Sequence, residues 1–403
     1  METIGGSGLL LFSLVIYRIT EYCICMKRLL LLLLSTFSTG RAATPMDPLL
    51  AFARTQPHDL AVSTYALQAD GTPDTRRHTL NWNSTQPMPL ASSMKIVVLA
   101  AYAHAVASGT LNAQLPVTLR DWEGFYLPGT DGGAHASSLK TLGLPADRSG
   151  RASTPDRTVP LDTLARFMIE TSDNAATDLI LSRLGPQAVR QTATRLHLTG
   201  QDDIGPIAGM FSTWDTPRDQ TALLTMTAAQ RTALYWQRAE QVRQDPSLRD
   251  PAAVQRRARA VEPATANALQ NRSAPAGTTR DYAALMARVL TGAGLPDTEL
   301  QIMRRHLGWP MRVNPGNDEV FTRLYAKGGS LSGGVLTSNL AFTPKVGPAA
   351  GHPLVVSVFL RNVPAGQYRA LQDSLDEALL MIAIRPDLAQ QLTDALGSAA
   401  PKK

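Results

Sequence analysis

The feature that most constrains the fold is a change of hydrophobic period along the chain. The last third alternates apolar and polar residues, which predicts three consecutive antiparallel strands at 319–327, 333–342 and 353–360. Near the start, 59–68 and 76–82 predict a β-hairpin, because a turn containing Gly, Pro and Asp joins two strand-like runs. We therefore expect an α+β fold, with one antiparallel sheet built from both chain ends, flanked by helices, and an all-helical lobe between them.

Residues 91–107 predict a helix buried inside the protein, because they are apolar on nearly every side and end at a Ser-Gly pair. Residues 200–272 are more polar and read as helices of balanced charge, and we interpret them as a helical insertion. Further helices are expected at 46–57, in two pieces between 160 and 200, at 278–290 and at 366–383.

The first 42 residues predict a signal peptide that is not part of the fold. From Met26, which we take as the true initiator, a basic pair precedes six leucines and then small residues near Ala42. The alternative is a membrane anchor made from this run and an earlier apolar run, but neither reaches transmembrane length. We expect an exported protein, periplasmic or extracellular, with no stable membrane insertion after signal removal. The folded domain is predicted at 44–390, followed by a flexible tail at 391–403.

The composition excludes several classes of function. With 44% apolar residues in 403, the chain can bury a substantial core, and its formal charge of +6 is interspersed, so no nucleic-acid surface is expected. Both cysteines, Cys23 and Cys25, lie upstream of Met26, which leaves the expected mature chain without disulfides or thiolate sites. The seven histidines have no metal-ligand spacing, and nothing in the sequence requires a cofactor or metal. The oligomeric state is left open.

Two Ser-x-x-Lys pairs occur, Ser92/Lys95 in "ASSMK" and Ser137/Lys140 in "ASSLK". The first opens the buried helix, where free N–H groups and the positive end of the helix dipole favour a developing negative charge. A buried ammonium one turn away is destabilised, so that its neutral amine can accept the serine proton. The second pair precedes a Gly- and Pro-rich loop, and we expect it to be a solvated surface pair.

Two other motifs carry chemistry. "SDN" at 172–174 is expected on a helix, where Ser172 can relay a proton and the Asn174 amide can hold a substrate; the alternative is an ordinary polar helix turn. "KGGS" at 327–330 ends a predicted strand, where Lys327 can attract a substrate carboxylate and the two glycines let a ligand lie along the strand edge. The alternative there is a glycine-rich hairpin turn.

Taken in order, Ser-x-x-Lys, Ser-Asp-Asn and Lys-x-Gly form the signature set of β-lactamases and penicillin-binding proteins. Over about residues 46–385 the chain resembles the penicillin-recognising serine hydrolases, most closely the class A β-lactamases. Spacing favours the first serine, because Ser92 lies 80 residues before Ser172 whereas Ser137 lies only 35 before it, too few for the helical lobe.

The resemblance implies a role for each matching residue. Ser92 is the acylated nucleophile, Lys95 accepts or relays its proton, and Ser172 passes the proton to the leaving group. The oxyanion is held by two backbone N–H groups. The remaining residues bind the substrate. Asn174 holds its amide, Lys327 attracts its carboxylate, and Gly329 lies at the strand edge along which it binds. The two N–H groups that hold the oxyanion belong to Ser92 and Ser330.

The sequence departs from this family in two places. The third motif is Lys-Gly-Gly, without the hydroxyl that usually follows the lysine, and Ser330 or Ser332 are the candidates to replace it. No "ExxLN" follows SDN, and in class A enzymes that segment supplies the glutamate that activates the deacylating water. The candidates for that role are all carboxylates without a matching pattern: Asp202, Asp203, Glu123 and Asp131.

The sequence therefore predicts a secreted serine hydrolase acylated at Ser92 by a small-molecule β-lactam, ester or peptide-like substrate. An esterase or a D,D-peptidase of the same fold is an alternative within this class. A non-catalytic penicillin-recognising binding protein on the same scaffold is an alternative from another class.

Overall fold

The structure is a computed structural model that describes residues 44–398 apart from residues 69 and 78. These residues belong to one compact unit, 38–403, which is described by itself here. The predicted signal peptide, 1–42, and its initiator Met26 lie outside the described residues. Within the described ranges, no helix combines the length and the apolarity needed to cross a membrane.

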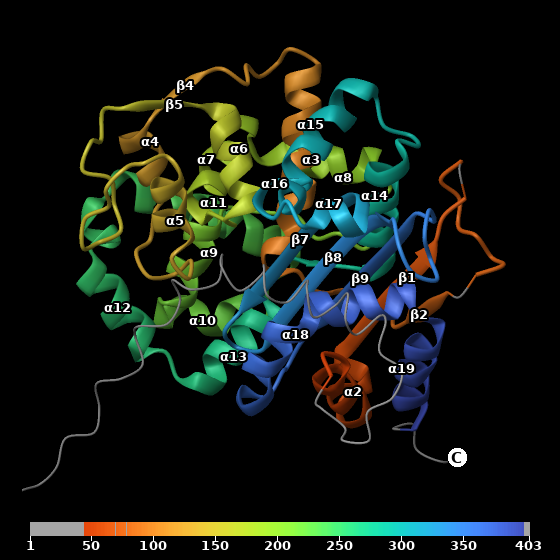
Figure 1. Ribbon diagram of the computed structural model, residues 1–403. Helices are drawn as coiled ribbons and strands as arrows, with labels where there is room; N and C mark the ends of the chain where they lie inside the picture. The colour runs from red at the N-terminus through yellow and green to blue at the C-terminus, as the bar shows by residue number, and fades with distance from the viewer. Residues whose placement is uncertain (1–43, 69, 78, 399–403) are drawn as a thin grey trace, which may run out of the picture. The chain divides into compact units, whose positions relative to one another are not determined.

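A five-stranded antiparallel sheet joins the two ends of the described chain (Figure 1). Its order is β2-β1-β9-β8-β7, so the N-terminal hairpin lies beside the last strand of the chain. This confirms the predicted sheet. Its strands are β1 (Leu60–Ala66), β2 (Leu80–Trp82), β7 (Phe321–Leu331), β8 (Val335–Pro344) and β9 (Leu354–Leu360).

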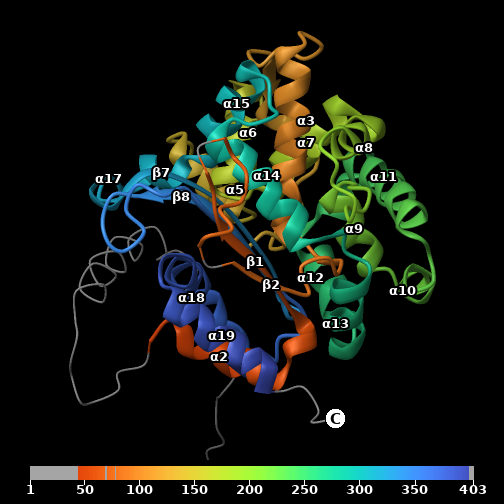
Figure 2. The ribbon, with the colours of Figure 1, turned by 90° about the vertical axis from the view of Figure 1, so that its right-hand side faces the viewer.

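Helices cover both faces of the sheet (Figure 2). Helix α18 (Ala365–Ile384) packs on β8 and β9 and also contacts α2 (Met46–Thr55), whereas α14 (Thr279–Thr291) packs on β1, β8 and β9 from the other face. The two central strands are accordingly buried along almost their whole length. Burial on both faces explains why β9 is apolar at every position except Ser357, which departs from the alternation expected from the sequence.

The helical lobe is built around α3 (Lys95–Ala107), whose first nine residues are all buried. Two short strand pairs, β3 (Met88–Pro89) with β6 (Ala276–Gly277) and β4 (Pro116–Thr118) with β5 (Thr158–Pro160), lie outside the main sheet. The lobe's other helices up to residue 200 are α4 (Leu119–Glu123), α5 (Ala134–Thr141), α6 (Leu161–Glu170), α7 (Asn174–Leu184) and α8 (Pro186–Arg195).

Helices also fill the stretch between the lobe's first half and the last strands. Before α14 come α9 (Ile207–Trp214), α10 (Pro217–Leu223), α11 (Ala228–Gln244), α12 (Pro251–Ala260) and α13 (Pro263–Arg272). After α14 come α15 (Asp297–Leu307), α16 (Trp309–Val313) and α17 (Asn317–Val320). Short 3₁₀ turns occur at Pro57–Asp59, Ala91–Met94 and Pro246–Arg249.

The segment 200–272 is helical, and it contributes to the main core. The N-terminus of α9 is fixed to α7, because the buried carboxylate of Asp178 accepts the backbone N–H groups of Ile207 and Ala208, each at 2.7 Å. Trp214 and Tyr235 from this segment pack in the same apolar cluster as α3. That the segment is an insertion stays a prediction, but its removal would expose part of this core.

The flexible tail predicted from residue 391 is wrong for its first part. Helix α19 (Pro386–Ser398) runs through it and packs on α2 and α18. The reason is an apolar stripe at helical spacing, with Leu392 and Leu396 both fully buried. Residues 399–403 lie outside the described residues.

Helix α9 and helix α11 approach each other most closely at Gly209, and this contact gives a testable expectation. A methyl group there would overlap the Tyr235 carbonyl oxygen and lie 2.9 Å from the backbone nitrogen of Ala239. Because backbone atoms cannot move aside as a side chain can, Gly209→Ala should cost about 1–3 kcal/mol of unfolding free energy. Urea denaturation measures this.

The matched control is Gly366→Ala, because a methyl group on that glycine of α18 meets no atom within 4 Å. Its unfolding free energy should stay within about 1 kcal/mol of the parent protein. Equal stability of the two variants would contradict the tight α9–α11 contact.

Candidate active site

Ser92 lies in the 3₁₀ turn Ala91–Met94, immediately before α3, and is half-buried. The residue before it, Ala91, has φ +45°, a left-handed conformation that costs a non-glycine residue about 1–2 kcal/mol. The sequence predicts one continuous helix from residue 91, and this turn is where the structure differs. The turn ends at Lys95, whose ordinary helical geometry begins α3.

Strand β7 passes directly against this turn. A methyl group on Gly329 would overlap the backbone nitrogen of Ser92, lie 2.9 Å from that of Ser93 and lie 2.8 Å from Thr337 Oγ1. Glycine is therefore required for the strand to come this close. The strand also continues to Leu331, past the end predicted at residue 327, because Gly329 still pairs with Thr337 of β8.

Lys95 is fully buried and makes three short contacts. Its Nζ donates to the backbone oxygen of Ser172 at 2.7 Å, to Ser172 Oγ at 3.2 Å and to Asn174 Oδ1 at 2.7 Å. Burial lowers the pKa of Lys95 from 10.5 to about 8, although the carboxylates of Asp173 and Asp178 oppose the shift. A neutral amine is therefore accessible near neutral pH.

A second buried lysine reaches the same hydroxyl from the sheet. Lys327 on β7 is 4% exposed, and its Nζ donates to Ser172 Oγ at 2.9 Å and to the Gly328 carbonyl at 2.9 Å. Burial and then the neighbouring charge of Lys95 lower the pKa of Lys327 well below its usual value. Because Ser172 Oγ accepts from both lysines, its own proton is free to be directed to a third group.

The SDN motif forms a turn between α6 and α7, which corrects the prediction that it lies on a helix. Ser172 has φ +65°, and Asp173 is the N-cap of α7, with Oδ1 accepting the Ala176 N–H at 2.9 Å. Only Asn174 is helical, as the first residue of α7. The reason is that Asp caps a helix more favourably than it continues one, and the preceding residue must then turn the chain.

The structure thus brings together most of the predicted site. Lys95, Ser172, Asn174 and Lys327 are joined by hydrogen bonds. Gly329 contacts the Ser92 turn. Ser330 is the next residue of β7, exposed and opposite Leu336. The set combines the Ser92 hydroxyl at a helix start, the Lys95 amine, which can lose its proton, and the Lys327 amino group on an edge strand.

The other Ser-x-x-Lys pair lies on α5, and neither of its side chains belongs to the hydrogen-bonded set of Lys95, Ser172, Asn174 and Lys327. Lys140 is exposed and Ser137 is half-buried, as expected for a surface pair. The backbone oxygen of Ser137 accepts the Thr141 hydroxyl within the same helix.

A buried polar network beside the Ser92 turn was not predicted from the sequence. Ser93 Oγ lies 2.8 Å from Thr337 Oγ1 and accepts from Asn339 Nδ2 at 2.8 Å, and Asn339 also donates to the Lys327 carbonyl at 3.2 Å. Ser357 Oγ donates to Asn339 Oδ1 at 2.8 Å. Thr337 and Asn339 share one face of β8 because alternate residues of a strand point the same way, and this spacing was the available signal.

The proposed water-activating carboxylates are engaged elsewhere. Asp203 pairs with Arg190 at 2.7 Å, and Asp202 accepts the Ala276 N–H at 3.1 Å and lies 3.8 Å from Arg231. Both aspartates line a cavity of about 370 Å³ beside α8, whose lining includes neither serine nor lysine. The other two candidates, Glu123 and Asp131, surround a buried histidine.

Asp178 is a further buried carboxylate that no sequence motif indicated. Burial raises its pKa to about 7, against the opposing effect of the two α9 N–H groups that it accepts. Its partners lie 29 and 30 residues away, so local sequence could not reveal the contact. Across the described ranges, no group of three His, Cys, Asp or Glu side chains could hold a metal ion.

Comparison with known proteins agrees with this arrangement. The sequence model of the Beta-lactamase enzyme family matches residues 52–308, which is more than half of the chain. The chain belongs to this family. Its α+β architecture is the β-lactamase fold, and membership implies a serine hydrolase scaffold and a small-molecule substrate. No curated protein matches the chain.

Several solved structures are similar to this family member. A β-lactamase from Sphaerobacter thermophilus is 18% identical with a TM-score of 0.47, covering 83% of this chain and 96% of that chain. A β-lactamase from Burkholderia vietnamiensis is 14% identical with a TM-score of 0.47, covering 84% and 98%. The structure of PBP-A is 16% identical with a TM-score of 0.45, covering 85% and 100%.

The lowered pKa of Lys95 can be measured directly. The chain has only seven lysines, so NMR of protein labelled with ¹³C at lysine Cε should resolve the buried ones. We expect one resonance to titrate near pH 8, with the neutral amine present above that pH and the ammonium below it. Lys95→Met identifies it by its disappearance. A Lys95 resonance that titrates at the ordinary value of 10.5 would contradict the burial argument.

Proposed function

We propose that this member of the β-lactamase family is a serine hydrolase that is acylated at Ser92 by a β-lactam or a related amide or ester. The observation that carries the proposal is the convergence of two buried lysines, Lys95 and Lys327, on one hydroxyl, Ser172 Oγ, beside the turn that carries Ser92. A structural ion pair would place a carboxylate between two such ammonium groups, whereas this site leaves them poised for proton transfer.

Acylation follows from these contacts. The neutral amine of Lys95 takes the hydroxyl proton of Ser92 as its oxygen bonds to the substrate carbonyl carbon. The oxyanion is stabilised by the backbone N–H groups of Ser92 and Ser330. The carbon–nitrogen or carbon–oxygen bond then breaks, and Ser172 passes a proton to the leaving atom. Asn174 holds the amide of the substrate.

Lys327 contributes the binding charge. Its pKa is lowered by burial and by Lys95, and an arriving substrate carboxylate supplies the opposite charge that raises the pKa again. The lysine therefore favours anionic substrates, and the bound carboxylate keeps it protonated.

Deacylation requires a group that activates a water molecule. Asp202 and Asp203 are held by other groups, and Glu123 has its carboxylate on the Ala152 N–H and a histidine. We therefore propose a slowly hydrolysed acyl-enzyme. An esterase or D,D-peptidase activity remains the alternative within the family, and a non-catalytic binding protein is favoured only if no acyl group transfers.

We also propose that the chain is exported to the periplasm or the extracellular space. The proposal rests on the sequence of the first 42 residues alone.

The first test is intact-protein mass spectrometry of the chain after exposure to a panel of β-lactams and simple esters. Ring opening loses no atoms, so a β-lactam should add its full mass to the protein, whereas an ester adds only its acyl part. The adduct should disappear in Ser92→Ala and persist in Ser137→Ala, the matched control on α5.

The outcomes separate the alternatives. A persistent Ser92 adduct supports acylation with slow deacylation. Rapid turnover that depends on Ser92 supports hydrolysis with another water-activating group. The absence of both adduct and turnover across the panel would contradict the hydrolase proposal and favour a binding protein.

A second test addresses the close approach of β7 to the nucleophile. In Gly329→Ala the new methyl group must push the strand away from the Ser92 amide, which widens the proposed oxyanion site. The acylation rate should fall by roughly 10²-fold or more, the usual loss for one oxyanion donor. Stopped-flow kinetics with a chromogenic cephalosporin measures it. Gly366→Ala is again the control, and an unchanged rate in Gly329→Ala would rule out this oxyanion site.

A further inference from the structure

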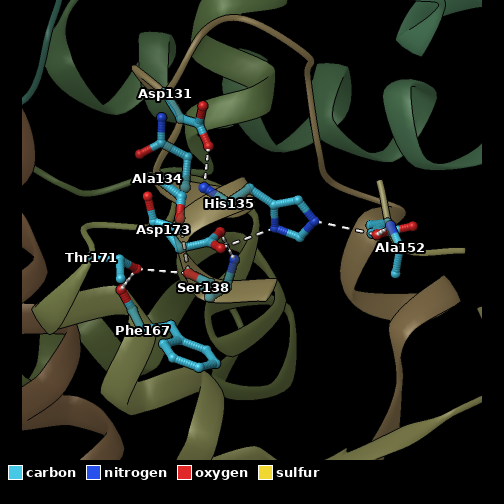
Figure 3. Close-up of polar contacts among 12 residues, drawn as sticks. Asp131, Ala134, His135, Ser138, Ala152, Phe167, Thr171 and Asp173 are labelled. Carbon is cyan, nitrogen blue, oxygen red and sulfur yellow. Dashed lines mark hydrogen bonds and ion pairs between the residues drawn. The ribbon is translucent and has the colours of Figure 1, made fainter. Parts of the chain in front are cut away.

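A buried ionic network lies directly behind the SDN turn (Figure 3). His135, at the start of α5, is completely buried. Its Nδ1 lies 3.0 Å from Asp173 Oδ2, and its Nε2 lies 3.3 Å from Glu123 Oε1. Tyr126 lies tilted over the ring with its centroid 4.3 Å away, and Trp122 packs against the ring in an edge-on arrangement at 4.7 Å.

This geometry favours the imidazolium form. Both ring nitrogens face carboxylate oxygens, and a neutral imidazole has only one N–H to donate. Burial by itself would lower the pKa of His135, but Asp173 and Glu123 more than reverse this and raise it to about 9. A single cation is therefore shared by two carboxylates.

Each of the two acidic residues also bonds to a different part of the chain. Glu123 Oε1 also accepts the Ala152 N–H at 2.6 Å. Asp173 caps α7 through Oδ1, and its own N–H donates to the Phe167 carbonyl at 3.1 Å. The histidine thus connects α4 and the loop that contains Ala152 with the turn between α6 and α7.

The connected turn is the one that presents the proton relay. Asp173 lies between Ser172 and Asn174, and both of these contact Lys95. Ser172 is held at φ +65°, a conformation that persists only where the surroundings over-determine it. Moving Asp173 would therefore move the hydroxyl that both lysines share.

We propose that His135 is a positioning residue for the reaction: as a cation clamped between Glu123 and Asp173, it holds the SDN turn so that Ser172 Oγ stays between the two lysines. Its kinetic consequence rests on the proposed acylation of Ser92. His135 touches no reacting atom and acts only through Asp173.

The charged groups around His135 decide how the clamp responds to pH. Glu123 faces it from α4 and Asp173 from the SDN turn, while Asp131, from the preceding loop, accepts its backbone N–H at 2.8 Å. Tyr126 covers the ring. Two arginines and a lysine lie further out: Arg151 over the Tyr126 ring, Arg249 on the Glu123 carbonyl, and Lys95 near Asp173.

The sign of the dependence follows from the raised pKa. Since the folded-state pKa of His135 is about 9 and that of free histidine about 6.5, the clamp contributes fully below about pH 6.5 and is lost as the pH rises through about 9. Lys95 loses its proton near pH 8. The acylation rate should therefore rise through pH 8 and fall again near pH 9.

The test uses the full chain with three variants. His135→Gln removes the cation. Glu123→Gln keeps the histidine but removes one of its two carboxylates. His306→Gln is the matched control, because His306 is also buried and bonded to an aspartate, Asp162 at 3.0 Å, outside the site. Acylation rates from pH 6 to 10, melting temperatures and NMR of ¹⁵N-labelled histidine are measured for each.

We expect His135→Gln to lower the acylation rate at pH 7.5 by about tenfold to a hundredfold. Glu123→Gln should move the falling, high-pH limb to lower pH, because one charge that raises the pKa of His135 is gone. A general loss of stability would not move this limb. A rate in His135→Gln equal to that of His306→Gln, or a high-pH limb unchanged in Glu123→Gln, would overturn the proposal.

NMR of the His135 ring tests the clamp independently of the proposed hydrolase activity. If the parent protein is never acylated, the hydrolase proposal fails, but the His135 ring still reports on the clamp. A doubly protonated ring at pH 7.5, with a Ser172 amide resonance that shifts in Glu123→Gln and not in His306→Gln, supports the inference. A neutral ring at pH 7.5 overturns it, and this result needs no folded variant.

Discussion

The structure depends on one constraint, that two buried ammonium groups meet at a single hydroxyl. Lys95 comes from the first turn of the central helix, and Lys327 comes from the inner part of β7, yet both donate to Ser172 Oγ. Burial makes two neighbouring cations unfavourable, which lowers the pKa of both lysines. The burial that costs stability therefore also makes the neutral amine of Lys95 available as a proton acceptor. The fold must hold α3, β7 and the SDN turn together to maintain this arrangement.

Several features of the fold follow from that requirement. The sheet must bring β7 to the start of α3, which needs a glycine at 329, where any side chain would overlap the Ser92 turn. The polar network of Ser93, Thr337 and Asn339 fixes the strand and the turn to each other within an otherwise apolar interior. On the lobe side, Asp173 caps α7 and pairs with His135, so that the SDN turn is fixed on that side as well. Buried polar groups of this kind specify one arrangement because each has a partner.

Much of this could be predicted from the sequence, and the exceptions have physical reasons. Alternating strands at both ends of the chain and an apolar helix after Lys95 predict the α+β sheet and lobe, because these patterns are local. Residues 172–174 were predicted to be helical, although Asp173 caps α7 within that helix's own first turn, and Leu392 was placed in a flexible tail because its burial against α2 depends on residues far along the chain. The network around His135 was not predicted at all, because its partners are 12 and 38 residues away.

The sequence by itself determined which chemistry is available: a serine and lysine one turn apart at a helix start, a Ser-Asp-Asn motif and a Lys-Gly-Gly strand. Spacing alone already favoured Ser92 over Ser137, because a helical lobe needs room between the first two motifs. Only the tertiary structure decided the pKa values of these ionisable groups and their hydrogen-bond partners. The pKa of Lys95 depends on burial by residues far along the chain, and the charge of His135 depends on two carboxylates from separate segments. Electrostatic energies are set by distance and desolvation in three dimensions, which no local pattern encodes.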